Sequence, residues 1–377
     1  MNLSKRDIRL DALRGMFLLI MAAVHVPTPV SHWLQEPFGF TSAAEGFIFL
    51  SASLAGLVYG RVGRDKGWSE MNQRIWGRAR QVYLTHLAVL LPMVLAAWLL
   101  AAWVTPLANH FHAFLQAPWE SLGAMPLLLH QPPLFDILPL YVLFLLATPL
   151  VLWIARRAGW RTILGISAGA WSLAQIGADA GWERLLRNAA PVCPGHFDLL
   201  AWQLLWVSGL ALGTMAAEGR QLSPGRPAGI FAGVIVCVGF LARHGILPVP
   251  QDGYLWMDKW TLGPLRLLNF SAWVVLLLSW NPRFKHEWLE RPALLGRHSL
   301  HVFAWHLPLV VAAGALVQLC PMPGWMQVMV GLSVMVALFP LALWSQARIR
   351  QRREFGPART LALPGRDAVL GVPKLRI

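Results

Sequence analysis

The sequence predicts an all-α, polytopic integral membrane protein with about ten transmembrane helices and both termini in the cytoplasm. Three observations predict this class: an apolar composition, a series of long apolar runs and an uneven distribution of cations. Of the 377 residues, 56% are hydrophobic and 13% are charged, with a mean hydropathy of +0.51. A soluble domain carries about 25% charged residues. The composition therefore argues against a cytosolic enzyme, a disordered chain and a disulfide scaffold.

The apolar runs approach the roughly 20 residues that a helix needs to cross a bilayer. The first is not a cleavable signal peptide, because it carries three ionisable residues and lacks a small-residue cleavage site. No loop is long enough for a second folded domain, so residues 1–347 are expected to form a single transmembrane domain, followed by a basic tail at 348–377. Ten runs occur, at 10–27, 42–60, 82–104, 134–154, 162–178, 198–217, 228–246, 262–280, 299–319 and 325–346.

The cations predict the orientation. The net charge is +14, and 26 of the 32 lysines and arginines fall on one side when the ten segments alternate, against four on the other side. This asymmetry is the positive-inside pattern of a cytoplasmic face. The charges are spread over many short loops and not gathered on one domain, so they do not predict nucleic-acid binding. The basic tail is expected to lie along the membrane lipids.

The first run carries an unusual set of ionisable residues, which are costly inside a membrane and are often functional there. Arg14 and His25 are eleven residues apart, or 20° past three helical turns, so they share one face about 16 Å apart along the axis. Asp11 can pair with Arg14 at i,i+3. An interfacial ion pair and a helix-end histidine are the alternative interpretation. We favour a functional stripe, with an ion pair at the cytoplasmic end and an imidazole near the external end.

Glu45 is predicted at the external start of the second helix, at a depth similar to that of His25. A carboxylate beside an imidazole fixes its tautomer and stabilises the imidazolium. The alternative is an acidic residue in a first helical turn, where the helix dipole favours it. The expected catalytic residues are therefore His25, Glu45 and Arg14.

Other polar residues recur at external helix ends or within spans. Asp136 precedes the fourth helix, Asp258 and Lys259 precede the eighth, Arg266 lies inside the eighth and His306 lies inside the ninth. We expect these five to bind substrate, although Asp136 is also explained as a simple N-cap. The external segment 105–133, with its histidines and aromatic residues, either covers a site or forms an interfacial aromatic belt.

Arg74, Arg78 and Arg80 form the densest internal cluster of cations, in the loop between the second and third spans. They either set the topology or, together with Arg14, bind the phosphates of a cofactor, because guanidinium groups bind phosphate bidentately. No phosphate-binding glycine motif is present. The cysteines lie far apart and no CxxC pair occurs, so no metal site is expected.

These residues resemble a known family. Arg14 and His25 match the R-x10-H pattern of the acyltransferase family 3 membrane enzymes, and the chain is most similar to the OpgC branch, which is linked to succinylation of osmoregulated periplasmic glucans. Ser51-Ala52-Ser53 departs from the usual Ser-Gly-aromatic. The matching blocks run in order from residue 9 to about 306: 9–15, 39–51, 56–61, 135–141, 200–205, 258–268 and 295–300.

The resemblance implies a bacterial inner-membrane O-acyltransferase. It implies an acyl-CoA donor (succinyl-CoA or acetyl-CoA) from the cytoplasm, a hydroxyl acceptor on a periplasmic glucan or other glycan, and a role for His25 in the transfer. His25 is then expected to act as a general base or through an acyl-histidine. Two other functions stay open. A multi-helix transporter or flippase would also use intramembrane Arg, His and Asp, and a non-catalytic subunit of a polysaccharide synthesis complex ranks third.

Overall fold

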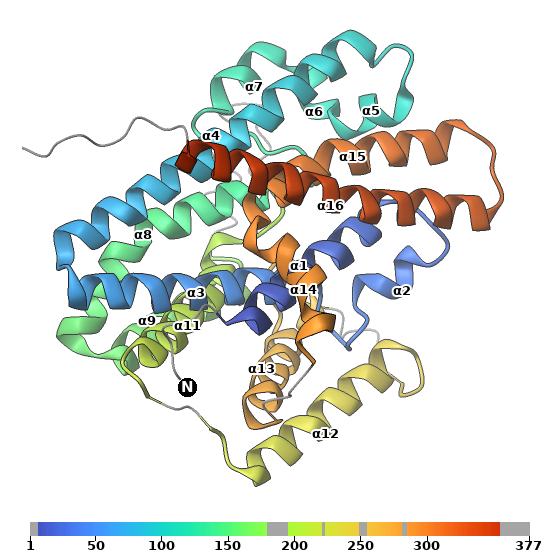
Figure 1. The fold of residues 1–377 in the computed structure, drawn as a ribbon. Helices are drawn as coiled ribbons and strands as arrows, with labels where there is room; N and C mark the ends of the chain where they lie inside the picture. The colour runs from blue at the N-terminus through green and yellow to red at the C-terminus, as the bar shows by residue number, and fades with distance from the viewer. Residues whose placement is uncertain (1–6, 179–194, 221–222, 249–254, 281–284, 355–377) are drawn as a thin grey trace, which may run out of the picture.

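A computed structural model describes residues 7–178, 195–220, 223–248, 255–280 and 285–354, and these residues form helices and no strand (Figure 1). The predicted all-α class is therefore confirmed. The elements are α1 (Ile8–His25), α2 (Ser31–Gln35), α3 (Ala43–Asp65), α4 (Trp68–Leu100), α5 (Thr105–His110), α6 (His112–Gln116), α7 (Pro118–Ala124), α8 (Ile137–Ala158), α9 (Trp160–Gln175), α11 (Leu199–Ala217), α12 (Arg226–Arg243), α13 (Pro264–Trp280), α14 (His286–Arg297), α15 (Ser299–Leu319) and α16 (Gly324–Glu354).

Each of the ten apolar runs falls on a helix. In the described residues, seven helices are long and apolar enough to cross a membrane: α3, α4, α8, α11, α12, α15 and α16. α13 is apolar but has 17 residues, α9 has 16, and α1 carries three charged residues over its 18. A multi-pass membrane protein is therefore supported, while the count of ten crossings and the cytoplasmic termini stay predictions.

Several helices lie where loops were expected. α4 has 33 residues and begins at Trp68, so the arginine cluster lies on its first turns and not in a loop. At 1.5 Å per residue such a helix is about 50 Å long and extends past the hydrocarbon core. α14 occupies most of the expected connection before α15, and α2 and α5–α7 occupy the expected external segments. α16 continues through residues 348–354, the start of the predicted tail.

Some of the lysines and arginines that were counted to predict the orientation lie outside the described residues, and so does Cys193. The cations are Lys5, Arg6, Arg184, Arg187, Arg283, Arg359, Arg366, Lys374 and Arg376.

α3 and α11 pack closely through small residues. A methyl group added at Gly213 would lie 1.9 Å from the Ser53 carbonyl oxygen, and one at Gly56 would lie 2.4 Å from that of Leu210. Small residues let helix backbones approach in this way inside a membrane, where dispersion contacts replace the hydrophobic drive between helices. This packing fixes the position of α3, the helix that carries Glu45.

α1 runs through the interior and packs against α14, α3, α15 and α16 (Figure 1). Its contact with α14 is also backbone to backbone. A methyl group at Gly15 would lie 1.8 Å from the Pro292 carbonyl oxygen, and one at Gly296 would lie 1.8 Å from that of Asp11. These two glycines hold the helix that bears Arg14 and His25 in a fixed rotation, which decides what each side chain faces.

Candidate functional site

The residues at one end of the α1 stripe face α3, α14 and α15. Arg14 donates a 2.5 Å hydrogen bond from Nη2 to Ser299 Oγ, and its guanidinium lies 5.8 Å from the centre of the Phe47 ring. The buried Asp11 has Arg297 of α14 at 3.9 Å. Arg14 is thus held by the first turn of α15 and by an aromatic face of α3.

A small cavity connects Arg14 with α4. Its lining includes Arg14, Ser51, Arg78 and Tyr141, and its volume is about 20 Å³. That space is close to what a single water molecule requires, so a larger group could enter only if the surrounding helices moved apart. Two arginines and three hydroxyl-bearing residues border it, among apolar side chains, and the lining comes from five helices, α1, α3, α4, α8 and α15.

The arginine cluster of α4 divides between two faces of that helix. Arg78 lines the cavity and donates a 2.9 Å hydrogen bond to Gln81. Arg74 pairs with Glu70 at 2.8 Å on an exposed surface, and Arg80 is exposed. Residues two apart on a helix lie about 200° apart, so Arg78 and Arg80 point to different sides. Of the three cofactor-binding candidates on α4, the structure brings only Arg78 to Arg14.

At the other end of the stripe, His25 meets His306 of α15. The two ring centres lie 5.7 Å apart with 23° between the planes. Lys259 and His110 also lie within electrostatic range of the His25 ring. His306 is buried, and its Nδ1 contacts the Phe303 carbonyl oxygen. His25 and His306 therefore meet at this end of α1, and Lys259 and His110 act electrostatically on the His25 ring.

Glu45 does not hydrogen-bond to His25. One of its carboxylate oxygens accepts from the backbone N–H and the hydroxyl of Ser42, which completes a capping box at the start of α3. The other accepts from Arg266 Nη1 at 2.6 Å. The first-turn interpretation thus describes its local geometry, and the expected carboxylate–imidazole contact is absent among the described hydrogen bonds.

Arg266 is the centre of a buried ionic network. Besides Glu45 it pairs with Glu36, which lies in the segment between α2 and α3 and pairs in turn with Arg243 of α12. Arg266 Nε also donates to the Met257 carbonyl oxygen at 2.9 Å. Because two carboxylates already neutralise Arg266, it is poorly placed to bind a further anion. Glu36 was not among the expected site residues, since nothing local distinguishes it from a loop carboxylate.

The pKa of Glu36 reflects this network. Burial would raise the pKa of its carboxyl group, but the charges and hydrogen bonds of Arg266 and Arg243 outweigh burial and hold it below the ordinary 4.5. Glu36 is therefore ionised at neutral pH and connects the segment before α3 to α12 and α13.

The remaining expected substrate residues have different surroundings. Asp258 accepts 2.7 Å hydrogen bonds from the backbone and the hydroxyl of Thr261, so it stabilises a local turn. Asp136 is buried before α8 and makes no capping bond to that helix, and burial raises its pKa. The Lys259 ammonium lies 5.2 Å from the Trp260 ring centre and 5.9 Å from that of Phe197.

Two histidines of the predicted external segment 105–133 have depressed pKa values. Burial lowers the pKa of His130 to about 4. Burial also lowers the pKa of His110, and the contact of its Nε2 with the Pro133 carbonyl oxygen at 2.8 Å partly opposes this. Both rings are therefore neutral at neutral pH.

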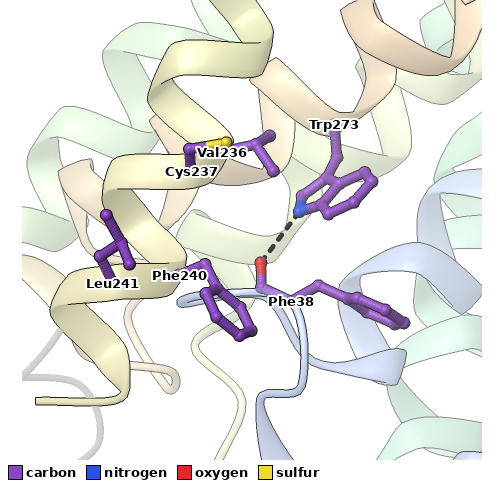
Figure 2. Close-up of a pocket in the computed structure, with 6 residues that line it drawn as sticks. All are labelled: Phe38, Val236, Cys237, Phe240, Leu241 and Trp273. Carbon is purple, nitrogen blue, oxygen red and sulfur yellow. Dashed lines mark hydrogen bonds between the residues drawn. The ribbon is translucent and has the colours of Figure 1, made fainter. Parts of the chain in front are cut away.

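A larger groove lies elsewhere. It runs between α12, α13 and Phe38 and has a volume of about 340 Å³ (Figure 2). Figure 2 shows apolar side chains and one thiol around it, with the Trp273 indole donating a 2.9 Å hydrogen bond to the Phe38 carbonyl oxygen. The lining has no carboxylate, histidine or cation, so the groove lacks the general base and the phosphate-binding cations that are expected of the transfer site.

The described residues contain no group of three or more His, Cys, Asp or Glu side chains arranged to hold a metal ion. The seven long apolar helices of the described residues support a multi-pass membrane protein, and the polar stripe of α1 lies within its helical bundle.

The family follows from comparison with known sequences. The model of the family described as OpgC protein matches residues 6–350, nearly the whole chain. The chain belongs to the OpgC family, and membership indicates an acyltransferase of that type. No curated protein and no solved structure matches the chain.

Proposed function

We propose that the protein is an O-acyltransferase of the bacterial inner membrane. It moves an acyl group, succinyl in our proposal, from acyl-CoA on the cytoplasmic side to a hydroxyl group of a periplasmic glucan. One observation carries the proposal: Arg14 and Arg78 border one cavity, and α1 leads from Arg14 to His25 about 16 Å away. The site can thus hold an anion at one end and a base at the other.

The donor end is supported by charge and by position. Arg14 and Arg78 come from α1 and α4 and can bind CoA phosphates, since guanidinium groups form charge-assisted hydrogen bonds with phosphate oxygens. The pantetheine arm would then follow the stripe toward His25. The cavity of about 20 Å³ is too small for that arm, so donor binding requires the helices that line it, α1, α3, α4, α8 and α15, to separate.

The reaction end centres on His25. The acceptor hydroxyl would give its proton to His25 as its oxygen attacks the thioester carbonyl, and the CoA sulfur would leave with that proton as a thiol. The alternative is an acyl-histidine: a ring nitrogen of His25 attacks the thioester carbonyl and the CoA thiolate leaves. The acceptor hydroxyl oxygen then attacks the acyl carbon and releases His25, and its proton passes to the thiolate.

Lys259 is the best candidate to bind the free carboxylate of a succinyl donor. Arg266 is already occupied by two carboxylates, whereas the Lys259 ammonium lies against aromatic rings near His25. A charge-assisted hydrogen bond contributes about 1.5–3 kcal/mol, so Lys259→Met should reduce transfer from succinyl-CoA roughly 10- to 100-fold. Transfer from acetyl-CoA should change far less. An equal loss with both donors would contradict this role.

The function is tested by reconstituting the purified protein in liposomes with acyl-CoA labelled in its acyl group on one side and glucan on the other. An acyltransferase consumes the thioester and labels the glucan covalently. A transporter or flippase would move a substrate across the membrane unchanged, and that result would replace the proposal.

A further inference from the structure

The contacts between α1 and α15 extend the candidate site to a second helix. Ser299 and His306 are seven residues apart on α15, 20° short of two turns, so they share one face. Ser299 accepts from Arg14 and His306 stacks near His25. Because residue numbers rise in the same direction in both pairs, α1 and α15 run parallel, and Arg14 and His25 each meet a polar residue of α15.

The tautomer of His306 follows from its backbone contact. A carbonyl oxygen can only accept a hydrogen bond, so the His306 Nδ1 that contacts the Phe303 carbonyl carries the hydrogen. The neutral ring then has its lone pair on Nε2. This Nε2 is buried and has no hydrogen-bond partner within the described part of the chain. His306 is thus an acceptor with nothing in the described chain to accept from.

His25 has a ring nitrogen that lacks a hydrogen-bond partner as well. Its Nδ1 is buried and makes no hydrogen bond to any described residue. If Nε2 of His25 is to take a proton from a hydroxyl, Nδ1 must carry the other hydrogen, and a buried donor without an acceptor destabilises that tautomer. Glu45 does not supply the acceptor, because its oxygens bond to Ser42 and Arg266 and no hydrogen bond joins it to His25 among the described residues.

We propose that His306 is the positioning residue of His25, with His306 Nε2 accepting a hydrogen bond from His25 Nδ1–H. With ring centres 5.7 Å apart, the bond forms through one bridging water or after a small rotation of either ring. No proton is transferred to His306. The acceptor hydroxyl's proton goes to His25 Nε2 and leaves with the CoA thiol, while His306 holds the reactive tautomer.

The tautomer part of this inference stands independently of the reaction, whereas the kinetic part rests on the proposed acyl transfer. Substituting His306 with asparagine or with glutamine tests the roles of its two ring nitrogens separately. His306→Asn keeps a donor near Nδ1 and loses the acceptor at Nε2, whereas His306→Gln keeps a polar amide near Nε2. Loss of an orienting group from a histidine base lowers kcat strongly, and we expect a 10- to 100-fold loss in His306→Asn by analogy. His306→Gln should recover much of that loss.

The first experiment does not require activity. Nitrogen NMR of histidine-labelled protein in nanodiscs, with the His25 signals assigned from His25→Ala, should report the Nδ1–H tautomer in the wild type and in His306→Gln. His306→Asn should shift that signal toward a tautomer mixture, whereas the control His110→Asn should not. An unchanged His25 tautomer in His306→Asn would overturn the proposal even if the protein transfers acyl groups.

The second experiment measures kcat and KM. His306→Asn should lower kcat with little change in KM for either substrate, and should cost nothing further in a His25→Ala background, because residues that act as a unit are not additive. Equal losses in His306→Asn and His306→Gln, or a further loss in the His25→Ala background, would overturn the positioning role. If the wild type transfers no acyl group but the tautomer shift is seen, the proposed function fails and the His25–His306 pairing survives.

Discussion

The buried ionic network around Arg266 gives a sharp prediction for stability. Glu45 is fully buried, and apart from the capping box its carboxylate is neutralised by Arg266 at 2.6 Å. Arg266→Met keeps a side chain of similar length but leaves that charge buried without its cation. Breaking a buried pair from one side costs about 3–5 kcal/mol, so we expect a loss of that size in the free energy of unfolding.

The neutral replacement of Glu45 supplies the matched control. Glu45→Gln should cost less, about 1–3 kcal/mol, because Arg266 keeps Glu36 and the Met257 carbonyl oxygen. In the double variant the buried charge is gone, so the loss should be smaller than the sum of the single losses by about 1–3 kcal/mol. Unfolding can be followed in mixed micelles by the fluorescence of the 20 tryptophans. A loss below about 1 kcal/mol in Arg266→Met, or strict additivity, would refute the reasoning.

Three further predictions concern packing, pH and donor binding. Gly213→Ala should destabilise the protein by at least about 1–3 kcal/mol, because the added methyl group would lie 1.9 Å from a backbone oxygen of α3. Gly169→Ala is the control: its methyl group would enter open space, so the same unfolding assay should show no change or a slight stabilisation. Because the folded pKa of Glu36 is depressed, its ionisation stabilises the protein above pH 4.5, and this stabilisation should be lost as the pH falls through the folded pKa. The melting temperature of the Glu36→Gln variant should therefore fall less at acidic pH than that of the wild type. An equal pH dependence in the two proteins would contradict this prediction. Arg78→Ala should raise KM for acyl-CoA roughly 10- to 100-fold, whereas the exposed Arg80→Ala should leave it within a factor of about two, and equal effects would remove Arg78 from the donor site.

Much of the architecture could be predicted from the sequence because apolar run length and helical period are local properties. The ten runs became ten helices, and the eleven-residue spacing of Arg14 and His25 puts both on one helix face. The rotation of one helix against another is not local. Glu45 and His25 were expected at similar depth, but depth does not fix direction, and Glu45 faces Arg266.

The missed elements have similar causes. Glu36 joins the network from a short segment between helices, where no period marks it. The arginines of α4 were expected in a loop. On the helix, the rotation of 100° per residue places Arg78 and Arg80 on different sides. α14 was missed because its segment is polar, and it is held against α1 by two backbone contacts at glycines.

The most direct test of the central claim is mass spectrometry of periplasmic glucan from cells that carry the wild-type gene, no gene, or the His25→Ala variant at matched membrane levels. If His25 acts in acyl transfer, only the wild type should add an acyl mass to the glucan, with the mass of a succinyl group if the donor is succinyl-CoA. Acylated glucan at the wild-type level in the His25→Ala strain would contradict the claim.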